Sequence, residues 1–386
     1  MGIGDIIDQV RSGAEASRED VIAMLSAEGR DRELLFENAR DVRDGKFGDK
    51  VFAYGFVYFS TYCHNNCTFC YFRRTNGIDR YRKTPEEIVD LALDLKEEGI
   101  DLVDLTMGED DRMYGDGFSG LVDIVSRVHG LGVSVMVSPG AVGEEAMPRL
   151  KEAGADFFAV YQETYNRELY SRLRPEQDFD FRCNQRAWAR AAGMLTEDGM
   201  MVGLGETVAD RADAILAMCA GPCEQIRCMT FVPQAGTPLQ NLEPTGSDME
   251  LKAIAAMRLL RPDRFIPATL DVEGVGGMKA RLDAGASTIT SIVVPRRHLA
   301  GVAQPEKDIE SGARGVDHVF ELVDGMGKKV ASQRDFSAML RRMKDAIPRR
   351  RLNTRSPHPR CGVPAGPYPA ERGRPAILPR RSRTAG

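Results

Sequence analysis

The chain has 386 residues, of which 42% are apolar and 28% are charged, and its formal net charge is −5. This length and apolar content suffice for one large core or two ordinary ones, which excludes disorder throughout the chain. No run approaches the roughly 18 apolar residues that a membrane span needs, and the first residues lack the order of a secretory signal. We therefore expect a cytoplasmic protein that does not contact a membrane.

The charge is distributed unevenly along the chain. Residues 348–386 contain ten arginines and one glutamate, a net charge of +9, and eight of the twenty prolines. Residues 1–347 then contain 42 basic and 56 acidic side chains, a net charge of −14. Because the end of the chain has almost no apolar periodicity, we predict a disordered basic tail over residues 347–386. Its single aromatic residue, Tyr368, disfavours nucleic-acid binding by base stacking.

Residues 1–48 are predicted to form helices that cap the main domain. Ser17 with an acid three residues later, Asp20, is typical of a helix start. Leu34, Leu35 and Ala39 recur at the spacing of one helix face.

From residue 51 onward, short apolar runs alternate with amphipathic helical segments. We predict strands at residues 51–59, 102–107, 133–138, 157–161, 200–203, 227–231, 265–270 and 288–293. Between the first two, Thr84-Pro85-Glu86-Glu87 predicts a helix start, with Ile88, Leu91, Ala92 and Leu95 as its apolar face. Eight such units in about 245 residues match an α/β protein of the (β/α)₈ TIM-barrel type, predicted over residues 49–346. An open doubly wound sheet is the alternative.

Three of the eight cysteines lie in the loop after the first predicted strand, with the spacing C-x₃-C-x₂-C: Cys63, Cys67 and Cys70. In a reducing compartment this clustering indicates metal rather than disulfides. Three thiolates on a short loop can hold three corners of a cubane [4Fe-4S] cluster and leave one iron open. Zinc would need a fourth ligand, and His64 is bonded directly to Cys63 and cannot easily reach the same ion. A ferredoxin would also need a fourth cysteine.

This spacing, with the aromatic Phe69 just before the last cysteine, resembles that of the radical S-adenosylmethionine (radical SAM) enzymes. The resemblance implies that S-adenosylmethionine binds the open iron through its amino and carboxylate groups. One electron from the cluster then yields a 5′-deoxyadenosyl radical, which abstracts a hydrogen atom from the substrate. The electron is expected from an external reductant of the flavodoxin or ferredoxin type.

Further candidate contacts for the cofactor lie at the ends of predicted strands. Gly108-Glu109 resembles the segment that holds the methionine amino group in this superfamily, with a surface turn as the alternative. Ser138 ends the third strand. Glu163 ends the fourth and is followed by Arg182, and the two resemble a pair that biotin synthase and the hydrogenase maturation enzymes use for S-adenosylmethionine. An ion pair on the rim is the alternative for these two.

Four residues are candidates for substrate binding inside the barrel: Asp104, Arg227, Thr269 and Asp271. Asp104 interrupts an apolar strand, where a carboxylate is costly without a partner cation. Thr269 and Asp271 are two residues apart and face the same way on an extended chain. We therefore expect one cation and two anions in the interior, an arrangement that suits an amino acid with a second amine. An internal salt-bridge network is the alternative.

Longer segments around these residues resemble the methylornithine synthase family: residues 58–63, 104–110, 161–165, 229–239 and 266–271. Its members are radical lysine mutases that open the pyrrolysine pathway. The resemblance implies that L-lysine is rearranged to (3R)-3-methyl-D-ornithine by hydrogen abstraction, Cα–Cβ cleavage and recombination. It also implies that the four interior residues bind the substrate, although Thr269 stands where a serine is expected.

Two alternative functions remain open at this point. The first is a radical enzyme related to the hydrogenase maturases that acts on another small substrate, for which the charged residues Asp104, Arg227 and Asp271 would be unnecessary. The second is a metal-bound scaffold whose basic tail recruits nucleic acid. For the lysine mutase that the resemblance implies, we expect a monomer.

Overall fold

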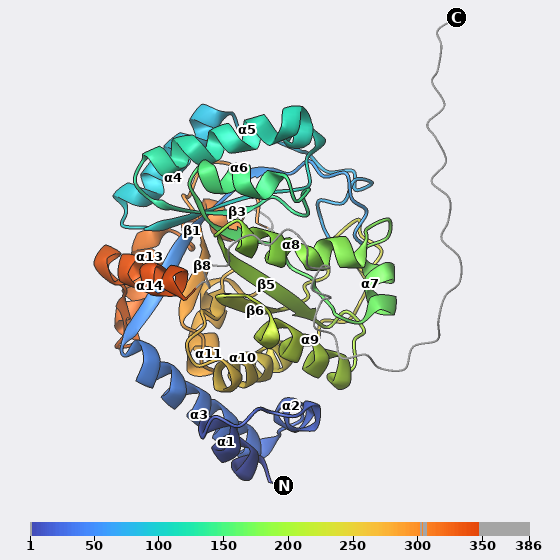
Figure 1. The fold of residues 1–386 in the computed structure, drawn as a ribbon, viewed down its shortest axis with the longest axis vertical. Helices are drawn as coiled ribbons and strands as arrows, with labels where there is room; N and C mark the ends of the chain where they lie inside the picture. Colours follow the sequence, from blue (N-terminus) through green and yellow to red (C-terminus); the bar gives the residue numbers. More distant parts are fainter. Residues whose placement is uncertain (1, 302, 304–306, 347–386) are drawn as a thin grey trace, which may run out of the picture.

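The computed structural model describes residues 2–301, 303 and 307–346 (Figure 1). The predicted disordered tail, residues 347–386, lies outside the described residues. The domain boundaries predicted after residues 48 and 346 remain predictions.

Eight parallel strands form a nearly closed barrel. The strands are β1 (Lys50–Ser60), β2 (Leu102–Met107), β3 (Ser134–Ser138), β4 (Ala155–Ala159), β5 (Leu195–Val202), β6 (Gln225–Thr230), β7 (Pro267–Thr269) and β8 (Thr288–Ile292). Their order is β6-β5-β4-β3-β2-β1-β8-β7. The remaining gap is bridged because the Ile226 N–H donates to the Phe265 carbonyl just before β7, over 3.1 Å. The barrel prediction is confirmed, and the open sheet is excluded.

The predicted strands differ most from the observed ones at β4 and β5. Strand β4 begins and ends two residues earlier than predicted, and β5 begins at Leu195 rather than at residue 200. The first half of β5 contains Glu197 and Asp198, which break the apolar pattern. Both are buried, and each is paired with an arginine, so the strand accommodates them without exposure.

Helices cover the outside of the barrel (Figure 1). They are α4 (Pro85–Glu97), α5 (Asp111–Gly130), α6 (Ala146–Glu152), α7 (Arg167–Leu173), α8 (Phe179–Ala191), α9 (Val208–Ala220), α10 (Asp248–Leu260) and α11 (Met278–Asp283). Helix α4 starts as predicted, because Thr84 and Glu87 cap one another. Its Leu95 packs against Gly55 of β1, where a Cβ atom would lie 2.6 Å from the leucine, so the strand needs glycine there.

Three N-terminal helices, α1 (Ile3–Arg11), α2 (Arg18–Leu25) and α3 (Gly29–Phe47), pack along α9 and α10 at the bottom of Figure 1. Ser17 caps α2, as predicted, by accepting from the Asp20 N–H. Ion pairs fix these helices to the barrel: Arg18 lies 2.6 Å from Asp213, and Arg32 lies 2.6 Å from Asp248. None of the helices in the described ranges is long and apolar enough to span a bilayer.

The amino-terminal end of the barrel is filled by aromatic rings. Phe52 at the start of β1 lies 4.9 Å from Phe265, 5.8 Å from Phe336 and 6.0 Å from Phe47, measured between ring centroids. Phe336 comes from α14 (Gln333–Asp345), which follows α12 (Lys307–Glu310), α13 (Val316–Gly325) and the short β9 (Lys329–Val330), paired with β1. Polar groups that meet a ligand therefore belong at the opposite, carboxyl end of the strands.

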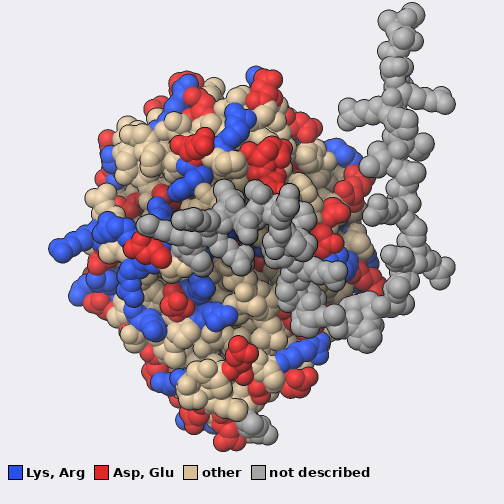
Figure 2. Space-filling model, in the orientation of Figure 1, with Lys and Arg blue, Asp and Glu red and all other residues tan. Residues whose placement is uncertain are grey.

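The described surface has no dominant sign of charge on the face in Figure 2. Lysine and arginine side chains are interspersed there with aspartate and glutamate side chains. This part of the described surface therefore offers no continuous basic patch of the kind that binds a phosphate backbone.

Candidate active site

The loop between β1 and α4 contains the predicted metal ligands Cys63, Cys67 and Cys70. Backbone hydrogen bonds hold this loop against neighbouring strand ends. The His64 N–H donates to the Glu109 carbonyl just past β2 over 3.0 Å, and the Thr68 N–H donates to the Leu173 carbonyl at the end of α7 over 2.8 Å. The loop is therefore fixed over the carboxyl end of the barrel.

Gly108, a predicted cofactor contact, is also where β2 meets this loop. A Cβ atom there would lie 2.2 Å from the Tyr62 carbonyl oxygen and 3.0 Å from Cβ of Cys63. The Gly108 N–H donates to the Ser60 carbonyl over 2.8 Å. No other residue fits, so the backbone after β2 lies directly against the first cysteine.

The three cysteines form a thiol cluster at the mouth of the barrel. Burial raises the pKa of Cys63 to about 11, and burial with the nearby cysteines also raises the pKa of Cys70. Among the described residues, no group of three or more histidine, cysteine or acidic side chains could hold a single metal ion. Three soft sulfur ligands on one loop suit a cubane cluster.

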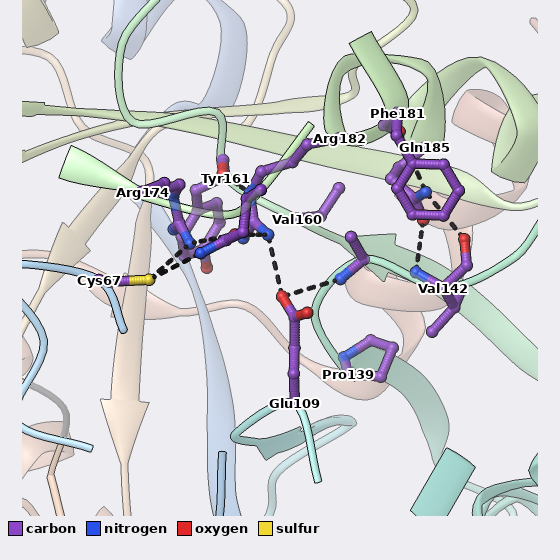
Figure 3. Close-up of polar contacts among 12 residues, drawn as sticks. Cys67, Glu109, Pro139, Val142, Val160, Tyr161, Arg174, Phe181, Arg182 and Gln185 are labelled. Atoms are coloured by element: carbon purple, nitrogen blue, oxygen red, sulfur yellow. Dashed lines mark hydrogen bonds and ion pairs between the residues drawn. The ribbon is translucent and has the colours of Figure 1, made fainter. Parts of the chain in front are cut away.

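Two side chains donate hydrogen bonds to Cys67. The Gln177 Nε2 atom lies 3.1 Å from Sγ. Nη1 of Arg174 lies 3.3 Å from the same sulfur (Figure 3). Sequence reasoning did not identify either residue, because both lie in the α7–α8 connection, more than 100 positions from Cys67. Both donors therefore point at the sulfur of one of the three predicted iron ligands.

Glu109 and Arg182, both predicted to contact the cofactor, are joined to one another. Arg182 Nη1 lies 3.0 Å from Glu109 Oε1, which also accepts from the Ala141 N–H over 3.2 Å (Figure 3). Burial alone would raise the pKa of Glu109, but His64 and Arg182 outweigh it and hold the pKa at about 2. Glu109 is therefore an anion that joins the end of β2 to the segment after β3 and to Arg182 of α8.

Glu163 is ion-paired with Arg174 rather than with Arg182. Its Oε1 atom lies 2.6 Å from Arg174 Nη2, and both side chains are buried. Its backbone has φ 66°, a region that non-glycine residues seldom adopt and that is found most often at functional sites. Neither Glu163 nor Arg182 lies on an exposed rim, and each has its own partner of opposite charge.

The interior contains a second buried pair, Arg227 of β6 with Glu197 of β5. Arg227 Nε lies 2.7 Å from Glu197 Oε1, Nη2 lies 2.7 Å from the Tyr54 hydroxyl, and Nη1 lies 3.3 Å from Thr290 Oγ1. These contacts occupy one N–H on each nitrogen. Since a guanidinium has five N–H groups, one on each terminal nitrogen remains for a carboxylate.

Asp104 lies across the barrel from this pair and has no cation within ion-pair distance among the described residues. Its Oδ1 atom accepts a hydrogen bond from Ser138 Oγ over 2.7 Å. Burial, together with the negative charge of Glu197, raises the pKa of Asp104 to about 7, although Ser138 and Arg227 oppose this shift. Asp104 is therefore a buried acid whose charge no cation of the described residues pairs with.

Asp271, which follows β7, contacts three other side chains. Oδ1 lies 2.8 Å from Arg314 Nη1, Oδ2 accepts from Ser291 Oγ over 2.5 Å, and Thr269 Oγ1 lies 3.5 Å from Oδ2. Thr269 and Asp271 do face the same way, as predicted. The expected interior of one cation and two anions is wrong, because Arg314 adds a cation and Glu197 adds an anion.

A cavity of about 140 Å³ brings the candidates together beneath the cysteine loop. Seven predicted site residues line it: Phe69, Cys70, Asp104, Ser138, Glu163, Arg227 and Asp271. Thr269 does not reach the cavity and lies behind Asp271. Glu109 and Arg182 line a neighbouring depression of about 310 Å³ with His64, next to the cysteine loop.

A parallel barrel with three cysteines after its first strand and a charged cavity beneath them defines a radical SAM protein. Residues 57–218 match the model of the radical SAM superfamily. The chain is 43% identical to 3-methylornithine synthase of Methanosarcina barkeri (strain Fusaro / DSM 804), covering 86% of this chain and 95% of the relative. It therefore belongs to the methylornithine synthase family, and the resemblance found in the sequence is confirmed.

Two further comparisons agree with this assignment. A crystal structure of methylornithine synthase has a TM-score of 0.82 to this chain at 42% identity, covering 86% of this chain and 99% of that one. The [FeFe] hydrogenase maturase subunit HydE of Thermotoga maritima is 36% identical over 71% of this chain and 80% of the relative. The chain thus shares its superfamily with the maturases but is more similar to the synthases.

Replacing Asp104 should change how stability depends on pH. The folded state raises the pKa of this acid from about 3.9 to about 7. The favourable contribution of the Asp104 carboxyl to the free energy of unfolding is therefore fully present below a pH of about 3.9. That contribution is lost as the pH rises through the higher value. Asp104→Asn removes this loss, so its stability relative to the wild type should increase by about 2–3 kcal/mol between pH 5 and pH 8.

The measurement is urea unfolding of both proteins at the two pH values. The control is Asp79→Asn, which replaces an exposed acid and should show no such increase. A difference between Asp104→Asn and the wild type that is the same at pH 5 and pH 8 would contradict the assignment of this titration to Asp104.

Proposed function

We propose that the chain is a radical SAM lysine mutase, an intramolecular transferase that converts L-lysine to (3R)-3-methyl-D-ornithine. Hydrogen abstraction is followed by cleavage of the Cα–Cβ bond and recombination of the fragments at a different carbon. Membership of this family supports the proposed product. The Methanosarcina barkeri relative, of which the match covers 95%, is named 3-methylornithine synthase. The proposed reaction is the first step of pyrrolysine biosynthesis.

The proposed cofactors are a [4Fe-4S] cluster on Cys63, Cys67 and Cys70 and S-adenosylmethionine at the fourth iron. When bound, they supply the adenosyl radical after a flavodoxin- or ferredoxin-type protein delivers one electron. The proposed contacts to S-adenosylmethionine are Phe69, Gly108, Glu109, Ser138, Glu163 and Arg182. Two observations support this set: Oε2 of Glu163 has no partner among the described residues, and the backbone at Gly108 borders the first cysteine.

The charge balance of the cavity is the observation that carries the lysine proposal. Glu197 neutralises Arg227, and Arg314 neutralises Asp271. Among the described residues, Asp104 is left as the acid without a cationic partner, so their side chains give the interior a net charge of one negative when Asp104 is ionised. Lysine carries two ammonium groups and one carboxylate near neutral pH, a net charge of one positive, so it completes the pairing.

The positions of these groups agree with a diamino acid. The two remaining N–H groups of Arg227 suit the substrate carboxylate, and the carboxylates of Asp104 and Asp271 suit its two ammonium groups. Between them the cavity wall includes Phe56, Met201 and Met229, apolar side chains that suit a methylene chain. Together with the aromatic floor, this wall keeps water away from reactive fragments.

A hydrogenase maturase-like reaction on another small substrate is the alternative. It is supported by the 36% identity to a maturase subunit, HydE. Asp104 argues against it, because a substrate without a cationic group leaves this buried carboxylate unmatched among the described residues, whereas Arg227 and Asp271 have partners of their own.

Anaerobic reconstitution tests the function directly. The full chain, loaded with iron and sulfide and supplied with L-lysine, S-adenosylmethionine and a reductant, should yield 3-methylornithine and 5′-deoxyadenosine. Cys67→Ala should abolish both, because it removes one of the three thiolates that hold the cluster. Mass spectrometry and chiral chromatography identify the amino-acid product. A wild-type protein that forms 5′-deoxyadenosine but leaves lysine unchanged would instead support the maturase-like alternative.

Removing the Arg227–Glu197 pair should weaken lysine binding. The double substitution Arg227→Gln with Glu197→Gln removes both charges, so that no unpaired buried charge unfolds the protein. Loss of the bidentate contact should cost about 2–4 kcal/mol, roughly 30- to 900-fold in the dissociation constant. Isothermal titration of cluster-loaded protein with lysine measures this constant.

A different buried ion pair, Arg186 with Asp198, provides the matched control for that experiment. Arg186 lies 3.2 Å from Asp198, but neither residue lines the cavity. Arg186→Gln with Asp198→Asn should leave lysine affinity within a few-fold of the wild type. Equal affinities in the Arg227–Glu197 variant and the wild type would refute the role given to Arg227.

A further inference from the structure

The donors to Cys67 distinguish it from the other two cysteines. Gln177 and Arg174 approach its sulfur at 3.1 and 3.3 Å. In the described part of the chain, Cys63 receives hydrogen bonds from the backbone of Asn65 and Glu109 and Cys70 receives one from the backbone of Phe72, but neither accepts one from a side chain. Among the three cysteines, side-chain hydrogen-bond donors in the described part of the chain are therefore concentrated on Cys67.

The amide of Gln177 has only one reasonable orientation. Its Oε1 atom lies 3.3 Å from Arg174 Nη1 and 3.5 Å from Arg182 Nη1. Since both neighbours are cations and donors, the oxygen must face them and the NH₂ group must face the sulfur. Figure 3 shows the two arginine side chains next to each other, one near Cys67 and the other near Glu109.

Arg174 is itself fixed in this position. It pairs with Glu163 at 2.6 Å, and its guanidinium carbon lies 5.2 Å from the centroid of the Phe69 ring. Both contacts restrict the rotamer of a long side chain that would otherwise be mobile. The donors therefore form a rigid arrangement on one side of the cysteine loop.

We propose that Gln177, supported by Arg174, raises the reduction potential of a cluster bound through Cys67. This inference rests on the proposed function, because it requires the [4Fe-4S] cluster. Reduction transfers one electron from the external reductant to the cluster and increases the negative charge on its sulfurs. Hydrogen bonds to a ligating sulfur stabilise that extra charge, and a buried, low-dielectric setting strengthens the effect.

Gln177 provides a cleaner test than Arg174 because it is neutral. Replacing Arg174 would leave Glu163 buried without its partner, whereas Gln177→Leu removes a donor of similar size and no charge. Gln177→Glu places a carboxylate beside the sulfur and should act in the same direction more strongly. Gln240→Leu is the control, because Gln240 lies near the same loop and bonds to the Gly236 N–H instead of to a cysteine.

The experiment is an EPR-monitored redox titration of the reconstituted full-length proteins without S-adenosylmethionine. We expect the midpoint potential of Gln177→Leu to shift in the negative direction, so that the ratio of reduced to oxidised cluster at a fixed potential falls several-fold. A tenfold fall corresponds to about 59 mV for a one-electron couple. Gln177→Glu should shift further, and Gln240→Leu should match the wild type.

The outcomes separate this inference from the proposed function. If both Gln177 variants have the same midpoint potential as the wild type, the inference is overturned and the proposed function is not affected. A wild-type chain that assembles no [4Fe-4S] cluster would contradict the proposed function and the inference together. If Gln177→Leu fails to fold, the shift of Gln177→Glu relative to Gln240→Leu still decides the question.

Discussion

The guanidinium of Arg174 joins three parts of the site and fixes their positions relative to one another. It touches Cys67 in the loop after β1, Glu163 at the end of β4 and Gln177 before α8. A buried cation without partners would cost several kcal/mol, so these contacts depend on one another. The same requirement fixes Arg182, which bonds to the Tyr161 carbonyl and to Glu109. The mouth of the barrel is thus organised by two arginines whose charges are already matched.

The requirement that buried charges be paired also explains the cavity below. Arg227 and Arg314 each have an acidic partner, so neither confers a net charge on the interior. Asp104 has a hydroxyl donor in place of a cation, and burial raises its pKa to about 7. In the proposed function, the substrate ammonium would supply the missing charge. Selectivity for a cationic amino acid over a neutral one would then follow from one carboxylate rather than from the whole charged set.

Sequence reasoning identified features with local signals and missed those that depend on distant partners. The barrel follows from the alternation of apolar runs and capped helices, and the cysteine loop follows from its spacing. Glu197 was overlooked although it resembles Asp104, an acid inside a strand, because the apolar pattern of β5 was placed too late. Arg174 and Arg314 carry no local signal, since their partners, Glu163 and Asp271, lie 11 and 43 positions away and meet them only in the folded chain. Their roles needed the structure.

The two ends of the barrel differ in composition: the amino-terminal end is aromatic, and the carboxyl-terminal end contains the charged residues and the cysteines. The floor is aromatic and packed, with Phe52 and Phe265 in contact. The middle layer holds the paired charges, and the sulfur atoms lie at the mouth, where an external reductant can approach. The strand ends supply the charged residues and the loop supplies the sulfurs, and Arg174 couples the two sets through Glu163 and Cys67. A site that must retain a fragmented substrate while receiving an electron from outside is consistent with this one-ended design.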